Sequence, residues 1–152
     1  MTGRWSILRL LVGAGKLQDD ELFEQCDEIG IVVLPGICCC DAWQSWPVWT
    51  NQTAMVAAAS LRSQVKRLRR FPSVVTFLYS SDELPPPSVE QSYLDVFHSE
   101  NWGVGTISSA GWKHSTLTGV SGVKMAGPYG WSVITYTRRA ASSVRAPEQP
   151  SD

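Results

Sequence analysis

The sequence predicts an α/β fold in which strands and helices alternate along the chain. Three observations indicate this class: four apolar runs have the length of strands, amphipathic segments separate them, and the joints between them are short. Strand–helix–strand units with tight joints are typical of parallel sheets. Periodicity alone leaves two architectures open. One is part of a (β/α) barrel, which needs about 250 residues when complete, and the other is an open doubly wound sheet, which 152 residues could complete.

The first unit runs from a strand through a helix to a second strand. Residues 7–12 are apolar except for Arg9 and end at a Gly-Ala-Gly segment that leads into a loop. Acidic residues at 19–21 favour the positive end of a helix, and Gly30 stands in the usual C-terminal capping position. Residues 31–36 follow directly and predict a second buried strand.

The next segment contains the clearest helix of the chain, over residues 53–70. Its apolar stripe includes Ala54, Leu61 and Leu68, and basic residues lie largely on the other side. We interpret that basic side as a solvated outer face, with a phosphate site as the alternative. A loop over residues 37–50 precedes this helix. Three of its tryptophans recur at every third position and predict either one helical face or the rim of a pocket: Trp43, Trp46 and Trp49.

The third strand leads into a pair of acidic residues. Residues 74–79 are β-branched and aromatic, which predicts a strand buried on both faces. Asp82 and Glu83 follow it, and three prolines separate them from a helix that we expect Ser88 to cap and that runs to about residue 99. A weaker fourth strand is expected over residues 104–108. Because α/β folds place their chemistry at the C-terminal ends of strands, the two acids are candidates for catalysis. A solvated acidic turn is the alternative.

Composition argues against several classes of function. The chain has 13 basic and 14 acidic residues and a net charge of −1, so we expect neither a nucleic-acid partner nor binding to an acidic lipid surface. No apolar run approaches the length of a membrane span, and Arg9 interrupts the first apolar stretch, so we expect no signal peptide. The cysteines, at 26 and 38–40, lack the spacing of a zinc site, and we expect no metal and no other cofactor.

The C-terminal part holds a glycine-rich loop and a polar tail. Residues 119–129 lack the spacing of a nucleotide-binding loop. From residue 138 onward the chain has no periodic apolar content, which predicts a disordered tail over 138–152. We therefore expect a single domain over residues 5–137.

Five blocks of this sequence, within about residues 15–131, occur together in the order of a known family. They are residues 15–36, the Cys-Cys-Cys-Asp-Ala-Trp of 38–43, the Ala-Ala-Ala-Ser-Leu-Arg-Ser-Gln of 57–64, the Tyr-Ser-Ser-Asp of 79–82, and residues 119–129. These blocks resemble the exo-β-D-glucosaminidases of glycoside hydrolase family 2. The resemblance implies an incomplete TIM (β/α)8 barrel of about four βα units, roughly strands two to five. It also implies hydrolysis of β-1,4-linked glucosamine from the non-reducing end of chitosan oligosaccharides, with retention of configuration, and an extracellular location for full-length members.

The resemblance also assigns the catalytic acid/base. In the family it is the aspartate of a Gly-Ser-Asp motif at the end of the fourth strand, which corresponds here to Asp82, with Ser80 replacing the glycine and Ser81 matching. Glu83 is the alternative, because most other members of the wider family have Asn-Glu at this point. A general acid must keep its proton near the working pH, so apolar surroundings or a nearby negative charge must raise the pKa of its carboxyl group.

Substrate-binding residues are expected in the loops around the acid/base. Trp43, Trp46 and Tyr129 are candidates to stack on sugar rings, and Ser81 lies directly beside the acid. Asp41 could accept hydrogen bonds from sugar hydroxyls or bind the cationic amine. The alternative for these residues is packing within the loops or, for Asp41, a capping role.

The sequence departs from the family where the second catalytic carboxylate is needed. Retaining hydrolysis requires a nucleophile about 5–5.5 Å from the acid/base, and the family's nucleophilic glutamate lies on the seventh strand, which would fall beyond residue 152. Ala14 stands where the family has an acid, and the family's pattern breaks at Gly130. The later acids lie on a predicted helix, at its end, or in the tail: Glu90, Asp95, Glu100, Glu148 and Asp152.

We therefore interpret the chain as a fragment or defective gene model of an exo-β-D-glucosaminidase, inactive by itself because the nucleophile is absent. A non-catalytic remnant that binds chitosan or glucosamine oligosaccharides is the alternative. A small complete α/β domain with another role is a third hypothesis. An incomplete barrel leaves apolar edges unburied, so we also expect non-specific self-association.

Overall fold

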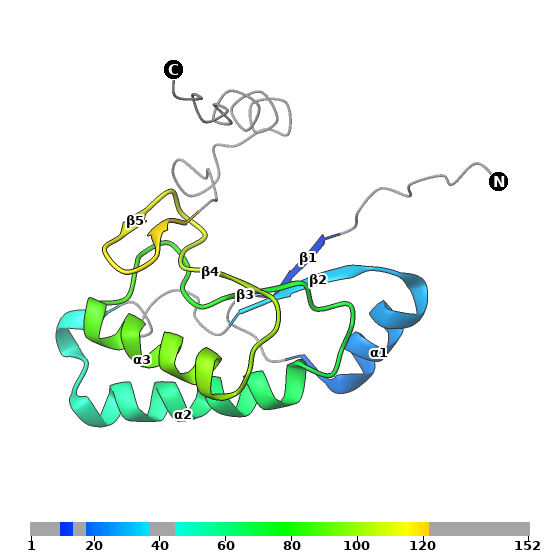
Figure 1. Cartoon of the computed structure of the whole chain (residues 1–152), viewed down its shortest axis with the longest axis horizontal. Helices are drawn as coiled ribbons and strands as arrows, with labels where there is room; N and C mark the ends of the chain where they lie inside the picture. Colours follow the sequence, from blue (N-terminus) through cyan, green and yellow to red (C-terminus); the bar gives the residue numbers. More distant parts are fainter. Residues whose placement is uncertain (1–9, 14–17, 37–44, 122–152) are drawn as a thin grey trace, which may run out of the picture.

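A computed structural model gives the fold and describes residues 10–13, 18–36 and 45–121 (Figure 1). Its main elements alternate as predicted: β1 (Leu10–Gly13), α1 (Asp20–Ile29), β2 (Val32–Pro35), α2 (Asn51–Leu68), β3 (Thr76–Leu78), α3 (Pro87–Ser99) and β4 (Gly105–Ile107). A short 3-10 helix, η2 (Trp46–Val48), precedes α2 in a segment predicted as loop. After β4 the chain forms a small antiparallel hairpin of β5 (His114–Ser115) and β6 (Gly119–Val120).

The strands β1 to β4 lie side by side in chain order and run parallel. β1 pairs with β2 and β3 pairs with β4, both in parallel register. Two parallel bridges, Val33↔Val74 and Gly36↔Leu78, connect the two pairs. At the second bridge the strands approach so closely that a Cβ on Gly36 would lie 2.6 Å from the Leu78 carbonyl oxygen, a distance that real Cβ atoms essentially never show. The parallel arrangement expected from the tight joints is therefore confirmed.

Helix α1 ends with a recognisable C-terminal cap, and helix α2 begins with a recognisable N-terminal cap. Gly30 follows α1 with φ of 70° and donates its N–H to the Cys26 carbonyl, which confirms the predicted C-terminal cap. Helix α2 begins at Asn51, slightly earlier than predicted, because Thr50 and Thr53 form a capping box. In this box each threonine hydroxyl accepts a hydrogen bond from the backbone N–H of the other residue.

The prediction that Ser88 caps α3 is wrong. A Ser88 cap would start the helix at Val89, but the helix begins two residues earlier, at Pro87, and Pro86 occupies the N-cap position without a side-chain hydrogen bond. The Pro86 carbonyl instead accepts the backbone N–H groups of Val89 and Glu90, both at 2.9 Å. Proline is well suited to the first helical position because its φ is preset and the N–H that it lacks would have no intrahelical acceptor there.

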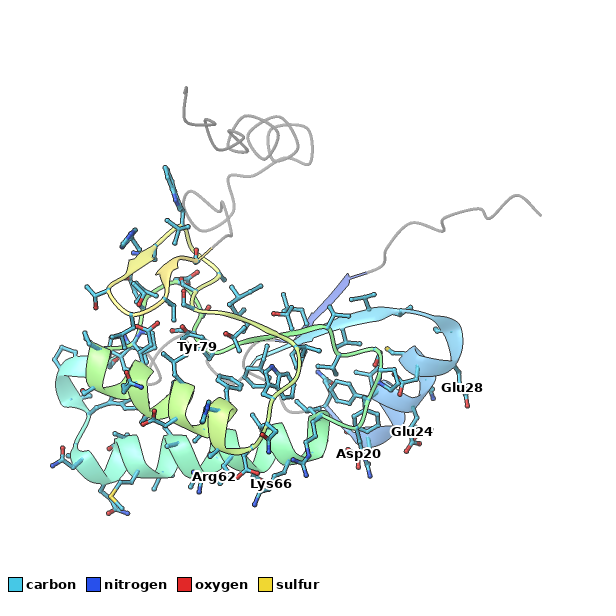
Figure 2. All side chains as sticks on the ribbon, viewed as in Figure 1. Asp20, Glu24, Glu28, Arg62, Lys66 and Tyr79 are labelled. Carbon is cyan, nitrogen blue, oxygen red and sulfur yellow. The ribbon has the colours of Figure 1, made fainter. Side chains whose placement is uncertain are left out.

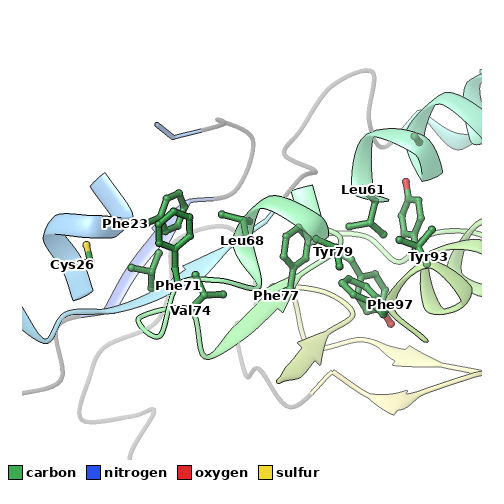
Figure 3. Packing of buried hydrophobic residues seen from close by; sticks show 14 of the residues in the cluster. Phe23, Cys26, Leu61, Leu68, Phe71, Val74, Phe77, Tyr79, Tyr93 and Phe97 are labelled. Atoms are coloured by element: carbon green, nitrogen blue, oxygen red, sulfur yellow. The ribbon is translucent and has the colours of Figure 1, made fainter. Parts of the chain in front are cut away.

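One cluster of buried side chains joins the helices to the strands (Figure 3). It includes Phe23 from α1, Leu61 from α2 and Tyr93 from α3, together with Val33 and Phe77 from the strands. Because all three helices contribute to the same cluster, they cover the same face of the strands. Burying a large apolar side chain typically contributes about 1.5–3 kcal/mol, so this cluster is the main source of the fold's stability.

The basic side of α2 faces outward, as predicted (Figure 2). Arg62 and Lys66 both lie near Glu100, at 3.4 and 3.7 Å, and Arg67 pairs with Asp20 of α1 at 3.0 Å. These basic side chains thus link α2 to α1 and to the end of α3. Such surface pairs typically contribute less than about 1 kcal/mol each, so they orient the helices more than they stabilise them.

Several predictions concern residues outside the described part of the chain, namely the cysteines at 38–40, the glycine-rich loop beyond residue 121, and the tail over 138–152. The domain limits 5 and 137 stay predictions for the same reason. Cys26 is free and buried on α1. Across the described ranges, no helix is long and apolar enough to span a membrane. The same ranges contain no cluster of three or more His, Cys, Asp or Glu side chains that could hold a metal ion.

Candidate active site

The two candidate acids lie just beyond the carboxyl end of β3. The pairing of β3 with β4 continues past Leu78, because Tyr79 donates its backbone N–H to the Ile107 carbonyl at 3.0 Å. Residues 80–86, here called the 80–86 loop, then lead to α3. Asp82 and Glu83 are both exposed in this loop. The predicted position of the two acids at the end of a parallel strand is therefore confirmed.

The 80–86 loop is fixed to the segment that follows β4, here called the 108–121 loop. The Ser81 carbonyl accepts the backbone N–H of Ala110 at 2.8 Å and the Ser109 hydroxyl at 2.7 Å. The buried Ser80 hydroxyl donates to the Glu83 carbonyl and closes the turn. Ser80 thus has a structural role in this loop. The backbone is held on both sides of Asp82, while the Asp82 side chain itself is exposed.

Glu83 differs from Asp82 in that its carboxylate is paired. The Lys113 ammonium donates to both carboxylate oxygens of Glu83 at 2.8 Å. The Glu83 side chain is 57% exposed and the Lys113 side chain 37%, so this pair contributes little to stability. It nevertheless occupies both oxygens of Glu83 and ties the 80–86 loop to the 108–121 loop a second time. Asp82 is therefore the better placed of the two acids to meet a ligand.

A third contact between the two loops involves Gly111. A Cβ at this glycine would lie 2.9 Å from the Asp82 carbonyl oxygen, so the two backbones touch directly. Gly111 is held in turn by the Ser109 hydroxyl, which accepts its N–H at 3.0 Å, and by the Ser121 hydroxyl, which donates to its carbonyl at 2.8 Å. The surroundings of Asp82 are thus built by the loops after two neighbouring parallel strands.

A buried carboxylate in α3, which our sequence analysis did not single out, anchors the 108–121 loop. Glu90 is 1% exposed, and three hydroxyl groups donate to it. Tyr79 and Thr118 donate to Oε1 at 2.7 and 3.0 Å, and Ser115 donates to Oε2 at 2.6 Å. Figure 2 shows Tyr79 between α3 and the β5–β6 hairpin. The carboxylate therefore connects the helix, the third strand and the hairpin.

Burial sets the electrostatics of this network. Burial, followed by the neighbouring Glu90 carboxylate, raises the pKa of the Tyr79 hydroxyl well above its ordinary value. Tyr79 therefore remains a neutral donor over the whole physiological pH range.

One sequence signal could have revealed the buried position of Glu90. It lies three residues before Tyr93 and seven before Phe97, which places a charged residue on the apolar stripe of α3.

Comparisons with known proteins identify the family. No family model matches the chain. The exo-β-D-glucosaminidase of Streptomyces avermitilis is 40% identical to it in an alignment 129 residues long, which covers 80% of this chain and 14% of that protein. The enzyme of the same name from Amycolatopsis orientalis is 36% identical over 129 residues. The chain is homologous to part of the exo-β-D-glucosaminidases. The family predicted from the five sequence blocks is therefore confirmed.

A solved exo-β-D-glucosaminidase shares the fold of this segment. The exo-chitosanase CsxA of Amycolatopsis orientalis matches with a TM-score of 0.75 and 34% identity, over 82% of this chain and 15% of that one. The chain thus spans about one seventh of the length of these relatives and corresponds to part of the CsxA structure. A mixed α/β fragment with parallel strands is what the sequence predicts.

The structure describes only some of the residues that the resemblance to exo-β-D-glucosaminidases assigns to sugar binding. Ser81 is buried and acts through its carbonyl. Trp46 lies in η2 and packs against Trp49, with ring centroids 4.7 Å apart, and against the core. This contact corresponds to the packing alternative, and a sugar-stacking role for Trp46 stays a prediction. The remaining three residues lie outside the described ranges: Asp41, Trp43 and Tyr129.

Proposed function

We propose that this chain is a fragment of the catalytic domain of a retaining exo-β-D-glucosaminidase, in which Asp82 is the general acid/base. The observation that carries the proposal is the position of Asp82. It is exposed at the carboxyl end of a parallel strand, on a backbone that the neighbouring loop fixes, in a chain homologous to this family. Active sites of (β/α)8 enzymes lie at this end of the strands.

The arrangement of the helices favours a partial barrel rather than a doubly wound sheet. In doubly wound sheets the helices cover both faces, whereas in a (β/α)8 barrel they form only the outer ring. Here four parallel strands follow one another in chain order, and helices α1, α2 and α3 share one core with one face of them. We propose that these strands are about four units of such a barrel, roughly the second to the fifth.

The chemistry assigned to Asp82 is proton transfer at the glycosidic oxygen. A carboxylic acid at this position would protonate the leaving oxygen and then, as a carboxylate, take a proton from the attacking water. Two variants of CsxA have been solved in complex with PNP-β-D-glucosamine. By homology, we propose that the substrate is a β-linked glucosamine unit of a chitosan oligosaccharide.

We further propose that the chain is inactive by itself because none of the acids that follow Asp82 in the described ranges is placed to act as the nucleophile. Glu83 is occupied by Lys113, and Glu90 is buried under three hydroxyl donors. The Asp95 carboxylate accepts from a neighbouring glutamine on the helix surface, and the Glu100 carboxylate lies beside the basic side chains of α2. Within the described ranges, none of these acids that follow Asp82 is free to attack an anomeric carbon.

A chimera separates the two candidate acids. Residues 74–121 would replace the homologous segment of the Streptomyces avermitilis enzyme, and kcat/KM would be measured on chitobiose. We expect the chimera to be active, Asp82→Asn to lower kcat/KM at least about 100-fold, and Glu83→Gln to change it less than about fivefold. Full activity of the Asp82→Asn chimera would refute the assignment. Loss of activity only in Glu83→Gln would transfer the role to Glu83.

The isolated chain tests the missing nucleophile. We expect no release of glucosamine from chitobiose, because a retaining mechanism requires both carboxylates. Glucosamine release that disappears in the Asp82→Asn variant would show that another group of this chain supplies the nucleophile.

A further inference from the structure

We propose that Trp112 stacks on a glucosamine unit next to the glycosidic bond whose oxygen Asp82 protonates. This inference rests on the proposed function and adds to it a specificity-determining side chain that the sequence motifs did not single out. Of the four tryptophans in the described ranges, only Trp112 is exposed, with 62% of its surface accessible. It directly follows Gly111, whose backbone touches the Asp82 carbonyl.

The other described tryptophans serve the core. Trp46, Trp49 and Trp102 are partly buried and pack against the hydrophobic cluster. Trp102 also donates its Nε1–H to the Gly105 carbonyl at 3.3 Å, near the amino-terminal end of β4. Trp112 has no such place in the core, although an indole is the most costly aromatic group to leave in water. Its exposure beside the acid/base loop therefore needs another explanation than packing.

The backbone that carries Trp112 is held in place on both sides. The Gly111 carbonyl before it accepts the Ser121 hydroxyl, and the Lys113 ammonium after it binds Glu83. The Lys113 carbonyl also accepts the Ser121 backbone N–H at 3.0 Å. An aromatic side chain on a fixed backbone loses little entropy when it binds a ligand, which is the property expected of a preformed subsite.

The chemistry of an indole face matches a glucosamine ring. One face of a β-linked pyranose presents C–H groups that pack on an aromatic surface. The protonated amine of glucosamine adds a cation–π attraction to the indole ring. The neighbouring Lys113 does not oppose this cation with a free charge, because it is paired with Glu83. The occupant of this subsite is therefore a glucosamine unit of a chitosan oligosaccharide rather than its N-acetylated counterpart.

Indole N–H signals in two-dimensional NMR spectra of the full chain test this inference. The probe is chitotriose, with N,N′,N″-triacetylchitotriose as the uncharged counterpart, and Trp112→Phe assigns the signal. We expect the Trp112 signal to shift in a saturable way with chitotriose, and the Trp102 signal, at the other end of β4, to stay in place. The Trp112→Ala variant should bind chitotriose about five- to tenfold more weakly, and the acetylated trimer should bind the unsubstituted chain more weakly.

Leu117→Ala is the matched control, because it removes a 42% exposed apolar side chain from the same loop. Its affinity for chitotriose should equal that of the unsubstituted chain. A chitotriose titration that leaves the Trp112 signal in place would overturn the inference, and an active 74–121 chimera would show that the proposed function survives it. Equal weakening by Trp112→Ala and Leu117→Ala would also overturn it. So would a Trp112→Ala variant with unchanged sugar affinity and reduced self-association, because the indole would then cover another protein surface.

Discussion

Glu90 shows how one buried side chain can determine the position of a distant loop. Its carboxylate receives hydroxyl donors from Tyr79, directly after β3, and from both sides of the β5–β6 turn. A buried carboxylate is tolerated only when such donors replace its lost hydration. The Ser115 hydroxyl also accepts the backbone N–H groups of Leu117 and Thr118, so the turn is built around the same group. The position of the 108–121 loop beside Asp82 therefore depends on Glu90.

We predict that Glu90→Ala destabilises the chain by roughly 3 kcal/mol, because the buried hydroxyl groups of Tyr79 and Ser115 and the more exposed hydroxyl group of Thr118 all lose their acceptor. Urea denaturation followed by circular dichroism measures the loss. Asp95→Ala, which removes an exposed carboxylate from the same helix, is the control and should change the free energy of unfolding by less than about 0.5 kcal/mol. Equal stability of the two variants would mean that the hydroxyl groups find other partners, and that Glu90 does not anchor the loop.

At the scale of secondary-structure elements, the close approach of β2 to β3 requires a glycine at position 36. We predict that Gly36→Ala lowers the free energy of unfolding by about 2–3 kcal/mol, because its Cβ would lie 2.6 Å from the Leu78 carbonyl oxygen and the backbone must shift. Gly105→Ala is the matched strand control. Its Cβ would meet the Thr76 side chain at an ordinary 3.6 Å, so stability should stay the same or rise slightly.

Thermal and urea unfolding of the two glycine variants measures this difference. A Gly36→Ala variant as stable as Gly105→Ala would show that β2 and β3 can separate without cost. The bridge between Gly36 and Leu78 would then not be a rigid part of the sheet.

The elements that follow from local patterns were predictable, and those that depend on distant partners were not. Gly30 identified the end of α1 because a left-handed cap requires no neighbour. The prediction that Ser88 caps α3 was wrong because Pro86, two residues earlier, occupies the N-cap position and Pro87 begins the helix. Glu90 reaches Ser115 and Thr118 at separations of 25 and 28 residues, and no local periodicity contains those contacts.

The candidate site was predictable to a similar extent. A strand followed by two acids placed Asp82 and Glu83 correctly at the carboxyl end of β3. The sequence did not reveal that Glu83 is paired whereas Asp82, within the described ranges, is not. That pairing depends on Lys113, which lies 30 residues beyond Glu83 and approaches it only through the pairing of β3 with β4. Trp112 was overlooked for the same reason. Its proximity to Asp82 arises from the fold rather than from spacing along the chain.

At the scale of the whole molecule, the described strands end in an edge. Within the described ranges β4 pairs only with β3, and Gly105 and Thr106 on it are exposed. Val75 and Val104, just before the paired residues of these two strands, are 44% and 40% exposed. An exposed strand edge beside apolar side chains is a template for pairing with another chain. We therefore expect self-association of the isolated chain through this edge.

The edge can be tested with one added charge. We predict that Thr106→Lys increases the monomer fraction in sedimentation velocity at a fixed protein concentration, because a lysine on an edge strand opposes pairing with a second copy. Gln52→Lys, which adds the same charge at an exposed position in the first turn of α2, should leave the monomer fraction unchanged. An equal effect of both substitutions would assign the change to net charge. A monomeric unsubstituted chain with a cooperative thermal transition by circular dichroism would show that this segment covers its own edge and folds as an independent domain.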